Sequence, residues 1–280
     1  MKNDTKNFDP IPSGKAEVSD VDVRRPMVRG DERQPGVRPL TGPSYRAFVQ
    51  RVSQLKAARN YLEIGVHNGS TIRLIACPTI GVDPDFVFKY DPMGKKPVLH
   101  LYRQTSDDFF LAHSPRDIFG AGVDLAFLDG LHLFEYLLRD FMNTEAACAP
   151  DGLILMDDCL PPNLEMTERE HRPALRRDQN LKDWWTGDVW KVVSALRQYR
   201  PDLRLTAVDV APTGSIVVGN LDPCSTVLRD SYDEILERYL EAPMSPEVFE
   251  AYWATNAPVT AEAALRQLRA LGYWRDAAEA

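Results

Sequence analysis

The sequence predicts a doubly wound α/β domain, and two observations support this fold class. From residue 44 to about residue 200, short apolar runs alternate with segments of helical periodicity. This alternation is typical of a parallel sheet with helices on both faces. The last two apolar runs, 203–210 and 215–218, are separated by only four residues. A link that short forms a hairpin, so we expect the final strand to be antiparallel.

The predicted elements follow one another along the chain. A helix is expected from Ser44, because Phe48, Val52 and Leu55 are spaced to form one buried stripe. Strands are then expected at 60–65, 79–83, 98–102, 123–129, 152–157, 203–210 and 215–218. Helices are expected at 70–76, 106–112, 134–148 and 189–199. The sequence therefore predicts a seven-stranded, mostly parallel sheet.

The chain divides into three parts. Residues 1–43 are rich in proline and charge and have no sustained period, so we expect an N-terminal arm that is disordered or orders against another surface. Residues 44–221 carry the α/β pattern. Within them, residues 159–187 interrupt the alternation, and a loop this long inside a compact domain is usually a lid or a binding loop.

A helical extension is expected at 222–280. Ser225, Ser245 and Thr260 each precede an apolar helical stripe and are suitable N-cap residues. These helices must cover either the sheet or a second subunit. Association into a homo-oligomer through them, or through the N-terminal arm, is therefore one interpretation.

The composition narrows the classes of function. The net charge of −8, from 33 Lys+Arg against 41 Asp+Glu, argues against a nucleic-acid partner. No apolar run approaches the roughly 20 residues of a membrane helix, and the first residues lack the apolar stretch of a secretory signal. The four cysteines have neither metal nor redox spacing. We therefore expect a cytoplasmic protein with reduced thiols and with neither nucleic acid nor a membrane as its partner.

The first motif with chemical meaning is Glu63-Ile-Gly65-Val-His-Asn-Gly69. Two glycines four residues apart, after a strand and before a helix, let the backbone turn tightly against a ligand. The motif is not the GxGxxG of dinucleotide binding. Eighteen residues after Gly65, the next strand ends in Asp83, which can accept hydrogen bonds from ribose hydroxyls. The alternative is a tight turn followed by an acid that caps the next helix.

Acidic residues also end the fourth and fifth expected strands, at Asp129 and at Asp157-Asp158. Neighbouring strands lie about 4.8 Å apart, so these carboxylates would crowd at one sheet edge if the two strands pair. Their repulsion requires a proton or a cation, and oxygen ligands favour Mg²⁺ or Ca²⁺. The alternative is that Asp158 caps a loop and Asp129 faces water. His132, three residues after Asp129, is either catalytic or a cap or packing residue.

In combination, these motifs resemble class I S-adenosylmethionine-dependent methyltransferases. The resemblance rests on Glu63-x-Gly-x-x-x-Gly69, Asp83, Asp129-Gly-Leu-His132-Leu-Phe-Glu135 and Gly152-Leu-Ile-Leu-Met-Asp157-Asp158. Within this family, the sequence is most similar to the bacterial small-molecule O-methyltransferase branch with an Asp-Gly-x-His motif. The resemblance covers roughly residues 44–220. The resemblance implies the strand order 3-2-1-4-5-7-6, with the last strand reversed.

The resemblance also implies roles for individual residues. Glu63 and Gly65 would lie along the methionine part of the cofactor, Asp83 would hold the ribose, Thr105 and Ser106 would contact adenine, and Gly69 and Asp129 would complete the cofactor site. Catechol O-methyltransferase-like enzymes place metal ligands at positions that match Asp129, Asp157 and Asp158. In those enzymes the third ligand is an amide, and the base is a lysine where this chain has His132.

The expected function is transfer of a methyl group from S-adenosylmethionine to a hydroxyl of a small molecule such as a sugar, a polyketide or a phenol. Mg²⁺ or another divalent cation would assist, with His132 and Asp129 as catalytic residues. At its ordinary pKa near 6.5, a neutral His132 could accept the proton at pH 7 to 8. Two alternatives stay open. One is a cofactor-binding protein without catalysis that acts as an interaction or regulatory partner, and the other is a nucleotide-dependent enzyme on the same sheet.

Overall fold

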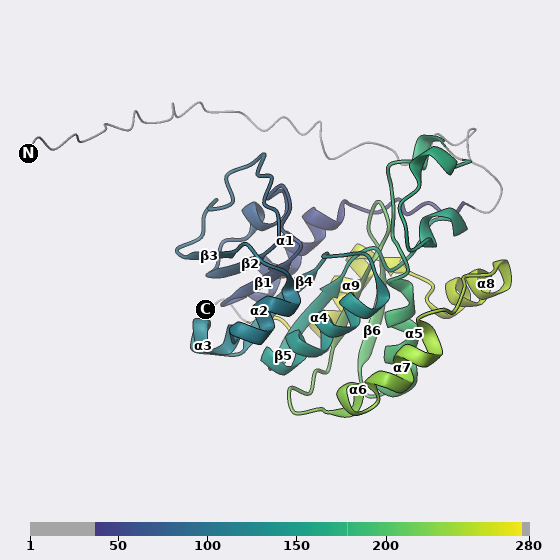
Figure 1. Ribbon diagram of the computed structural model, residues 1–280. Helices are drawn as coiled ribbons and strands as arrows, with labels where there is room; N and C mark the ends of the chain where they lie inside the picture. The colour runs from purple at the N-terminus through teal and green to yellow at the C-terminus, as the bar shows by residue number, and fades with distance from the viewer. Residues whose placement is uncertain (1–36, 178, 276–280) are drawn as a thin grey trace, which may run out of the picture.

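The computed structural model describes residues 37–177 and 179–275. Within them, eight strands form one sheet in the order β3-β2-β1-β4-β5-β7-β6-β8 (Figure 1). The strands are β1 (Tyr61–Ile64), β2 (Thr79–Val82), β3 (Leu99–Tyr102), β4 (Val123–Leu128), β5 (Cys148–Met156), β6 (Arg204–Asp209), β7 (Ser215–Gly219) and β8 (Val259–Thr260). Of the arm expected at 1–43, only residues 37–43 belong to the described part of the chain.

The order and direction of the strands confirm the predicted fold class. Strands β1 to β5 pair in parallel, and β7 pairs antiparallel with both β5 and β6. The predicted count of seven strands is one short, because β8 adds two residues beside the edge strand β6. A strand of two residues has no hydrophobic period, so no pattern in the sequence indicates it.

Helices and single helical turns connect and cover the strands. The helices are α1 (Tyr45–Lys56), α2 (Ser106–Ala112), α3 (Pro115–Phe119), α4 (Phe134–Ala147), α5 (Trp190–Tyr199), α6 (Val227–Asp230), α7 (Tyr232–Tyr239), α8 (Pro246–Thr255) and α9 (Ala261–Ala270). Single 3₁₀ turns are η2 (Ile72–Leu74), η3 (Leu164–Thr167), η4 (Pro173–Leu175) and η5 (Gln179–Leu181). Ser245 and Thr260 cap α8 and α9 with their side chains, as expected, and Ser44 caps α1.

Two helix predictions are wrong. The helix expected at 70–76 is only the turn η2, because Pro78 and the start of β2 follow within a few residues and leave no room for a longer helix. The single helix expected after Ser225 is divided into α6 and α7 at Ser231. Thr226, rather than Ser225, precedes α6, and its side chain makes no capping hydrogen bond.

The core lies on both faces of the sheet. On β4, Leu125 and Phe127 face one layer, and Ala126 and Leu128 face the other, as the two-residue period of a strand requires. Helices α1 and α9 cover the first face, and α4, α5, α7 and α8 cover the second. The C-terminal helices therefore pack on the sheet of their own chain (Figure 1). Among the described residues, no helix has the length and apolar character needed to cross a membrane.

Candidate active site

A cavity of about 810 Å³ opens at the edge where the parallel strands β1, β2, β4 and β5 end. Its walls come from the turns after these strands, from the first residues of α1 and from residues 183–185. Pockets that hold small-molecule ligands have volumes of about 300–1,000 Å³, so this cavity is large enough for one. Open α/β sheets bind ligands at this same edge.

The turn after β1 forms one end of the cavity. Gly65 has φ +89°, and a Cβ atom there would overlap the carbonyl oxygen of Asp129. Only glycine therefore lets β1 lie this close to the end of β4. The amide of Gly65 donates to the carbonyl of Val82 at 2.9 Å. Backbone contacts thus join the ends of three strands at this point.

Asp83 faces the cavity at the end of β2 and also stabilises the turn. Its two carboxylate oxygens accept hydrogen bonds from the amides of His67, at 2.7 Å, and of Asp85, at 2.8 Å. His67 itself has a positive φ of 45°, and its amide bond to Asp83 helps to hold that conformation. The Asp83 oxygens are therefore fixed in position while they face the cavity, where a hydroxyl donor could still reach them.

Thr105 and Ser106 line the cavity, and Thr105 caps α2 by accepting a hydrogen bond from the amide of Asp108. Two other expected cofactor residues do not line it. Glu63 is fully buried and accepts a hydrogen bond from the Tyr61 hydroxyl at 2.7 Å. Burial raises the pKa of Glu63 to about 8. The next residue, Ile64, lines the cavity. Because neighbouring residues of a strand face opposite sides of the sheet, the carboxyl of Glu63 lies on the side away from the cavity.

Gly69 also lies outside the cavity wall. It has φ +79°, and a Cβ atom there would come 3.0 Å from the ring of Phe88. The Phe88 segment is hydrogen-bonded to the turn, with the amides of Val87 and Lys89 donating to the carbonyls of His67 and Asn68. Gly69 thus permits the turn and its covering loop to approach one another.

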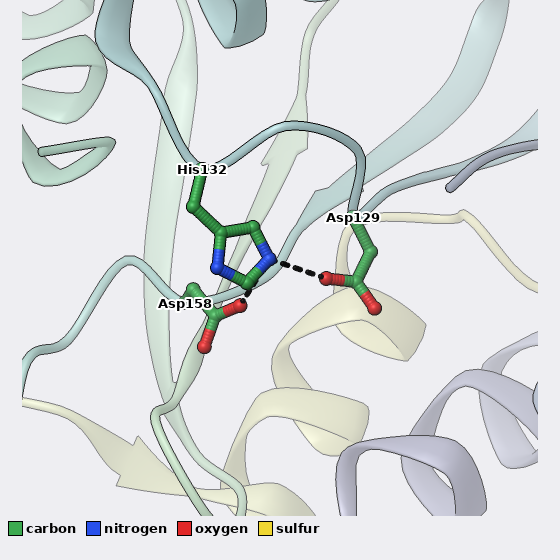
Figure 2. Close-up of side chains that lie close together, drawn as sticks. All are labelled: Asp129, His132 and Asp158. Atoms are coloured by element: carbon green, nitrogen blue, oxygen red, sulfur yellow. Dashed lines mark ion pairs between the residues drawn. The ribbon is translucent and has the colours of Figure 1, made fainter. Parts of the chain in front are cut away.

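Asp129, His132 and Asp158 form a cluster in the middle of the cavity wall. Nε2 of His132 lies 3.4 Å from an Asp129 oxygen and 3.0 Å from an Asp158 oxygen. In Figure 2 the imidazole points between the two carboxylates. One ligand atom from each of the three residues lies within 4.8 Å of the others. The ends of β4 and β5 therefore do bring acidic groups together, as their pairing predicts.

Asp157 has a different partner from the one we expected. It lines the cavity, but one of its oxygens accepts a hydrogen bond from the Ser215 hydroxyl on β7. Burial, with Asp129 and Asp158 nearby, raises the pKa of its carboxyl well above the usual range. The expected group of Asp129, Asp157 and Asp158 is therefore not the one that the structure gathers, and His132 occupies the third position. Asp158 has φ +57°, a strained conformation of the kind found at functional sites.

The ring of His132 is oriented by the backbone of the 159–187 segment. Its Nδ1 atom lies 2.7 Å from the carbonyl oxygen of Trp185. A carbonyl oxygen can only accept, so Nδ1 carries the hydrogen and Nε2 is the atom that gains or loses a proton. Burial lowers the pKa of His132, but Asp158, Asp129 and the Trp185 carbonyl together raise it to about 10. The expectation of a neutral His132 at pH 7 to 8 is therefore wrong for the protein without a bound cation.

Other contacts hold the 159–187 segment against the cavity. Arg169 forms ion pairs with Glu135 at 2.6 Å and with Asp188 at 2.7 Å. Gly187 has φ +59°, and a Cβ atom there would overlap the carbonyl oxygen of His132. Trp184 and Trp185 of this segment line the cavity.

The first residues of α1 are part of the site, although the sequence analysis did not identify them. Tyr45 and Arg46 both line the cavity, and the Tyr45 ring stacks on Phe127 at 5.7 Å. Burial and the nearby Asp129 raise the pKa of Tyr45 well above its usual value. In the sequence these residues stand only at the start of an amphipathic helix, and nothing there indicates that the helix begins at a sheet edge.

One family model and several solved structures are similar to part of this chain. Residues 62–159 match a family model described as a methyltransferase domain. A solved O-methyltransferase from Streptomyces achromogenes, involved in tomaymycin synthesis and in complex with SAM, is 15% identical, with a TM-score of 0.43 over 62% of this chain and 78% of that one. An O-methyltransferase from Bacillus cereus in complex with SAH is 14% identical, with a TM-score of 0.40 and the same coverages.

A methyltransferase from Podospora anserina, bound to SAH, is 13% identical, with a TM-score of 0.45 over 63% of this chain and 78% of that one. No curated protein matches the chain. The matched segment includes β1, β2, β4 and β5, together with the turns that line the cavity. Residues 62–159 are therefore similar to a methyltransferase domain, and strands β1 to β7 have the order that the resemblance implies.

Proposed function

We propose that the protein transfers the methyl group of S-adenosylmethionine to a hydroxyl of a small-molecule acceptor, with a divalent cation assisting. The observation that carries the proposal is the cluster of Asp129, His132 and Asp158 beside the turns at Gly65 and Asp83 in one cavity. S-adenosylmethionine supplies an electrophilic methyl group, so the protein has to hold an acceptor oxygen in line and remove its proton.

The cofactor end of the cavity is assigned to the turn at Gly65, to Asp83 and to Thr105 with Ser106. Asp83 can accept hydrogen bonds from ribose hydroxyls because its oxygens are already held by two backbone amides. Thr105 caps α2 and Ser106 is its first residue, and both line the same wall of the cavity. Asp129 belongs to the cluster, and its carbonyl lies against Gly65, so it adjoins both ligands in the proposal.

The oxygen atoms of Asp129 and Asp158 suit a hard divalent cation such as Mg²⁺. When bound, the cation would lower the pKa of an acceptor hydroxyl. The chain's own task is then to receive the proton, and we assign it to Nε2 of His132, because Nδ1 is committed to the Trp185 carbonyl. Trp184 and Trp185 would exclude water from the reacting groups. Asp157 stays a candidate ligand, although Ser215 already occupies one of its oxygens.

The test combines cofactor binding, chelation and a matched pair of variants. The purified protein is titrated with S-adenosylmethionine and assayed for methyl transfer to sugar, polyketide and phenol acceptors, with and without a chelator and added Mg²⁺. We expect binding in either condition and turnover only with the cation. Asp158→Asn should weaken Mg²⁺ activation more than Asp157→Asn, because Asp158 belongs to the cluster.

Each outcome bears on a separate part of the proposal. A chain that binds no S-adenosylmethionine contradicts the function as a whole. Turnover that a chelator leaves unchanged contradicts the cation alone. Equal losses in the two asparagine variants would return Asp157 to the ligand set. A homo-oligomer also remains a prediction, and size-exclusion chromatography with light scattering tests it directly.

A further inference from the structure

We infer that Arg46 binds the carboxylate of the methionine moiety of S-adenosylmethionine. The inference rests on the proposed function, because it presumes that this cofactor enters the cavity. It assigns a binding residue that neither motif contains. Arg46 lies in the first turn of α1, before β1, and its side chain lines the cavity near the Gly65 turn.

The cavity wall is mainly acidic. Five aspartates line it: Asp83, Asp129, Asp157, Asp158 and Asp183. Among the described lining residues, Arg46 is the one lysine or arginine. S-adenosylmethionine carries a carboxylate together with an ammonium and a sulfonium group. The two cationic groups suit the acidic wall, whereas the carboxylate is repelled from it and is attracted to Arg46.

In the turn at 65–70, four backbone amides already donate hydrogen bonds. A helix start or a nest of backbone amides commonly binds anions. Here the amides of Gly65, His67, Gly69 and Ser70 are already engaged by Val82, Asp83, Val66 and Asn68. These four amides are not free for the carboxylate, and Arg46, which is hydrogen-bonded to Ser70 of the turn, offers paired side-chain donors.

The guanidinium of Arg46 is held in place by two contacts. Its Nε atom donates to the Ser70 hydroxyl at 2.8 Å, so Arg46 is joined to the end of the cofactor turn. Its planar group also lies over the Tyr45 ring, 4.6 Å from the ring centre. Within the described residues, neither terminal nitrogen donates a hydrogen bond. Two parallel N–H groups on an oriented guanidinium match the two oxygens of a carboxylate.

The experiment compares ligands that differ in the carboxylate. Binding of S-adenosylhomocysteine and of 5′-methylthioadenosine, which lacks the amino-acid part, is measured by calorimetry for wild type and Arg46→Gln. We expect about 10- to 100-fold weaker binding of S-adenosylhomocysteine to Arg46→Gln, the range for a lost charge-assisted hydrogen bond. Binding of 5′-methylthioadenosine should be unchanged within about twofold, since it makes no such contact.

Two further variants sharpen the comparison. Arg51→Gln removes an exposed arginine from the same helix outside the cavity, and it should leave both affinities unchanged. Arg46→Lys keeps the charge but loses the paired donors, so its affinity for S-adenosylhomocysteine should be intermediate. A circular dichroism spectrum and a melting temperature confirm that each variant folds.

The contrary results are distinct. Equal weakening of both ligands means that Arg46 supports the nucleoside site or the fold, and an unchanged affinity for S-adenosylhomocysteine means that Arg46 does not touch the cofactor. A raised KM for the acceptor alone would assign Arg46 to the acceptor instead. Each of these overturns the inference while leaving the proposed function intact. Failure of the wild-type protein to bind either ligand overturns both.

Discussion

The two ends of the cavity are built in different ways. At the end assigned to the cofactor, Gly65, His67 and Asp83 are joined through backbone hydrogen bonds within twenty residues of sequence. At the end assigned to the acceptor, His132 is oriented by Trp185, more than fifty residues later in the chain. The first end is a local structure that a short motif can encode. The second exists only after the 159–187 segment has packed over the sheet edge.

The largest expected effect is at the acceptor end. His132→Ala should lower kcat by roughly 10²- to 10⁴-fold, the usual contribution of a general base, with the affinity for S-adenosylhomocysteine nearly unchanged. His171→Ala is the matched control, because the His171 ring stacks on Trp185 with 5.7 Å between the ring centres but does not belong to the cluster. Steady-state kinetics and calorimetry measure the two quantities. Full activity in His132→Ala would mean that another group takes the proton.

The backbone of the 159–187 segment provides the next test. Gly187→Ala places a methyl group against the carbonyl oxygen of His132 at a positive φ. We expect a loss of at least about 10-fold in kcat, because an ångström-scale displacement of a catalytic group can cost up to about 10²-fold. Gly120→Ala is the control, since Gly120 also has a positive φ of 65° but nothing lies near its Cβ position.

The control separates strain from displacement. Gly120→Ala should lower the free energy of unfolding by only about 1–2 kcal/mol, the ordinary penalty for a left-handed alanine. Its activity should be unchanged. Gly187→Ala should lower both stability, measured by urea unfolding, and kcat. Equal behaviour of the two variants would show that Gly187 does not position His132.

The comparison also explains which predictions from sequence succeeded. The alternation of strands and helices and the turns at Gly65 and Asp83 follow from local patterns and turn chemistry, whereas the strand order was implied by the family resemblance. The helix expected at 70–76 failed because an apolar run cannot reveal that Pro78 and β2 follow too closely. The role of Trp185 was out of reach because its contact to His132 is made by a backbone carbonyl, which every residue possesses.

Charge at the cluster shows the same limit. From the sequence, crowded aspartates require a proton or a cation, and we expected a metal ion to be that cation. In the structure the His132 ring lies between Asp129 and Asp158, and Ser215 binds Asp157. Of the two adjacent aspartates, Asp158 has the left-handed backbone and contacts His132, and the sequence does not indicate which of the two adopts that conformation.

A smaller effect is expected at the cofactor end. A ligand at 100 times Kd stabilises a fold by about 2.7 kcal/mol, and S-adenosylhomocysteine should do so here. Asp83→Ala removes an acceptor that faces the cavity, so the gain at the same ligand concentration should fall to about 1.4 kcal/mol or less, which corresponds to at least tenfold weaker binding. Asp85→Ala, two residues away and exposed, should keep the full gain. Thermal melts with and without ligand measure the difference, and an undiminished gain in Asp83→Ala would remove Asp83 from the cofactor site.

A pH dependence is also expected at the acceptor end in metal-free protein. The carboxylates of Asp158 and Asp129 raise the pKa of His132 to about 10, whereas an unfolded histidine titrates near 6.5. A raised folded pKa contributes stability that is fully present below about pH 6.5 and is lost as the pH rises toward about 10. The difference in unfolding free energy between wild type and His132→Gln, measured in chelator, should therefore shrink across this range. His171→Gln supplies the reference for an exposed histidine. A difference that stays constant from pH 6.5 to 10 would show that the two carboxylates do not hold a proton on His132.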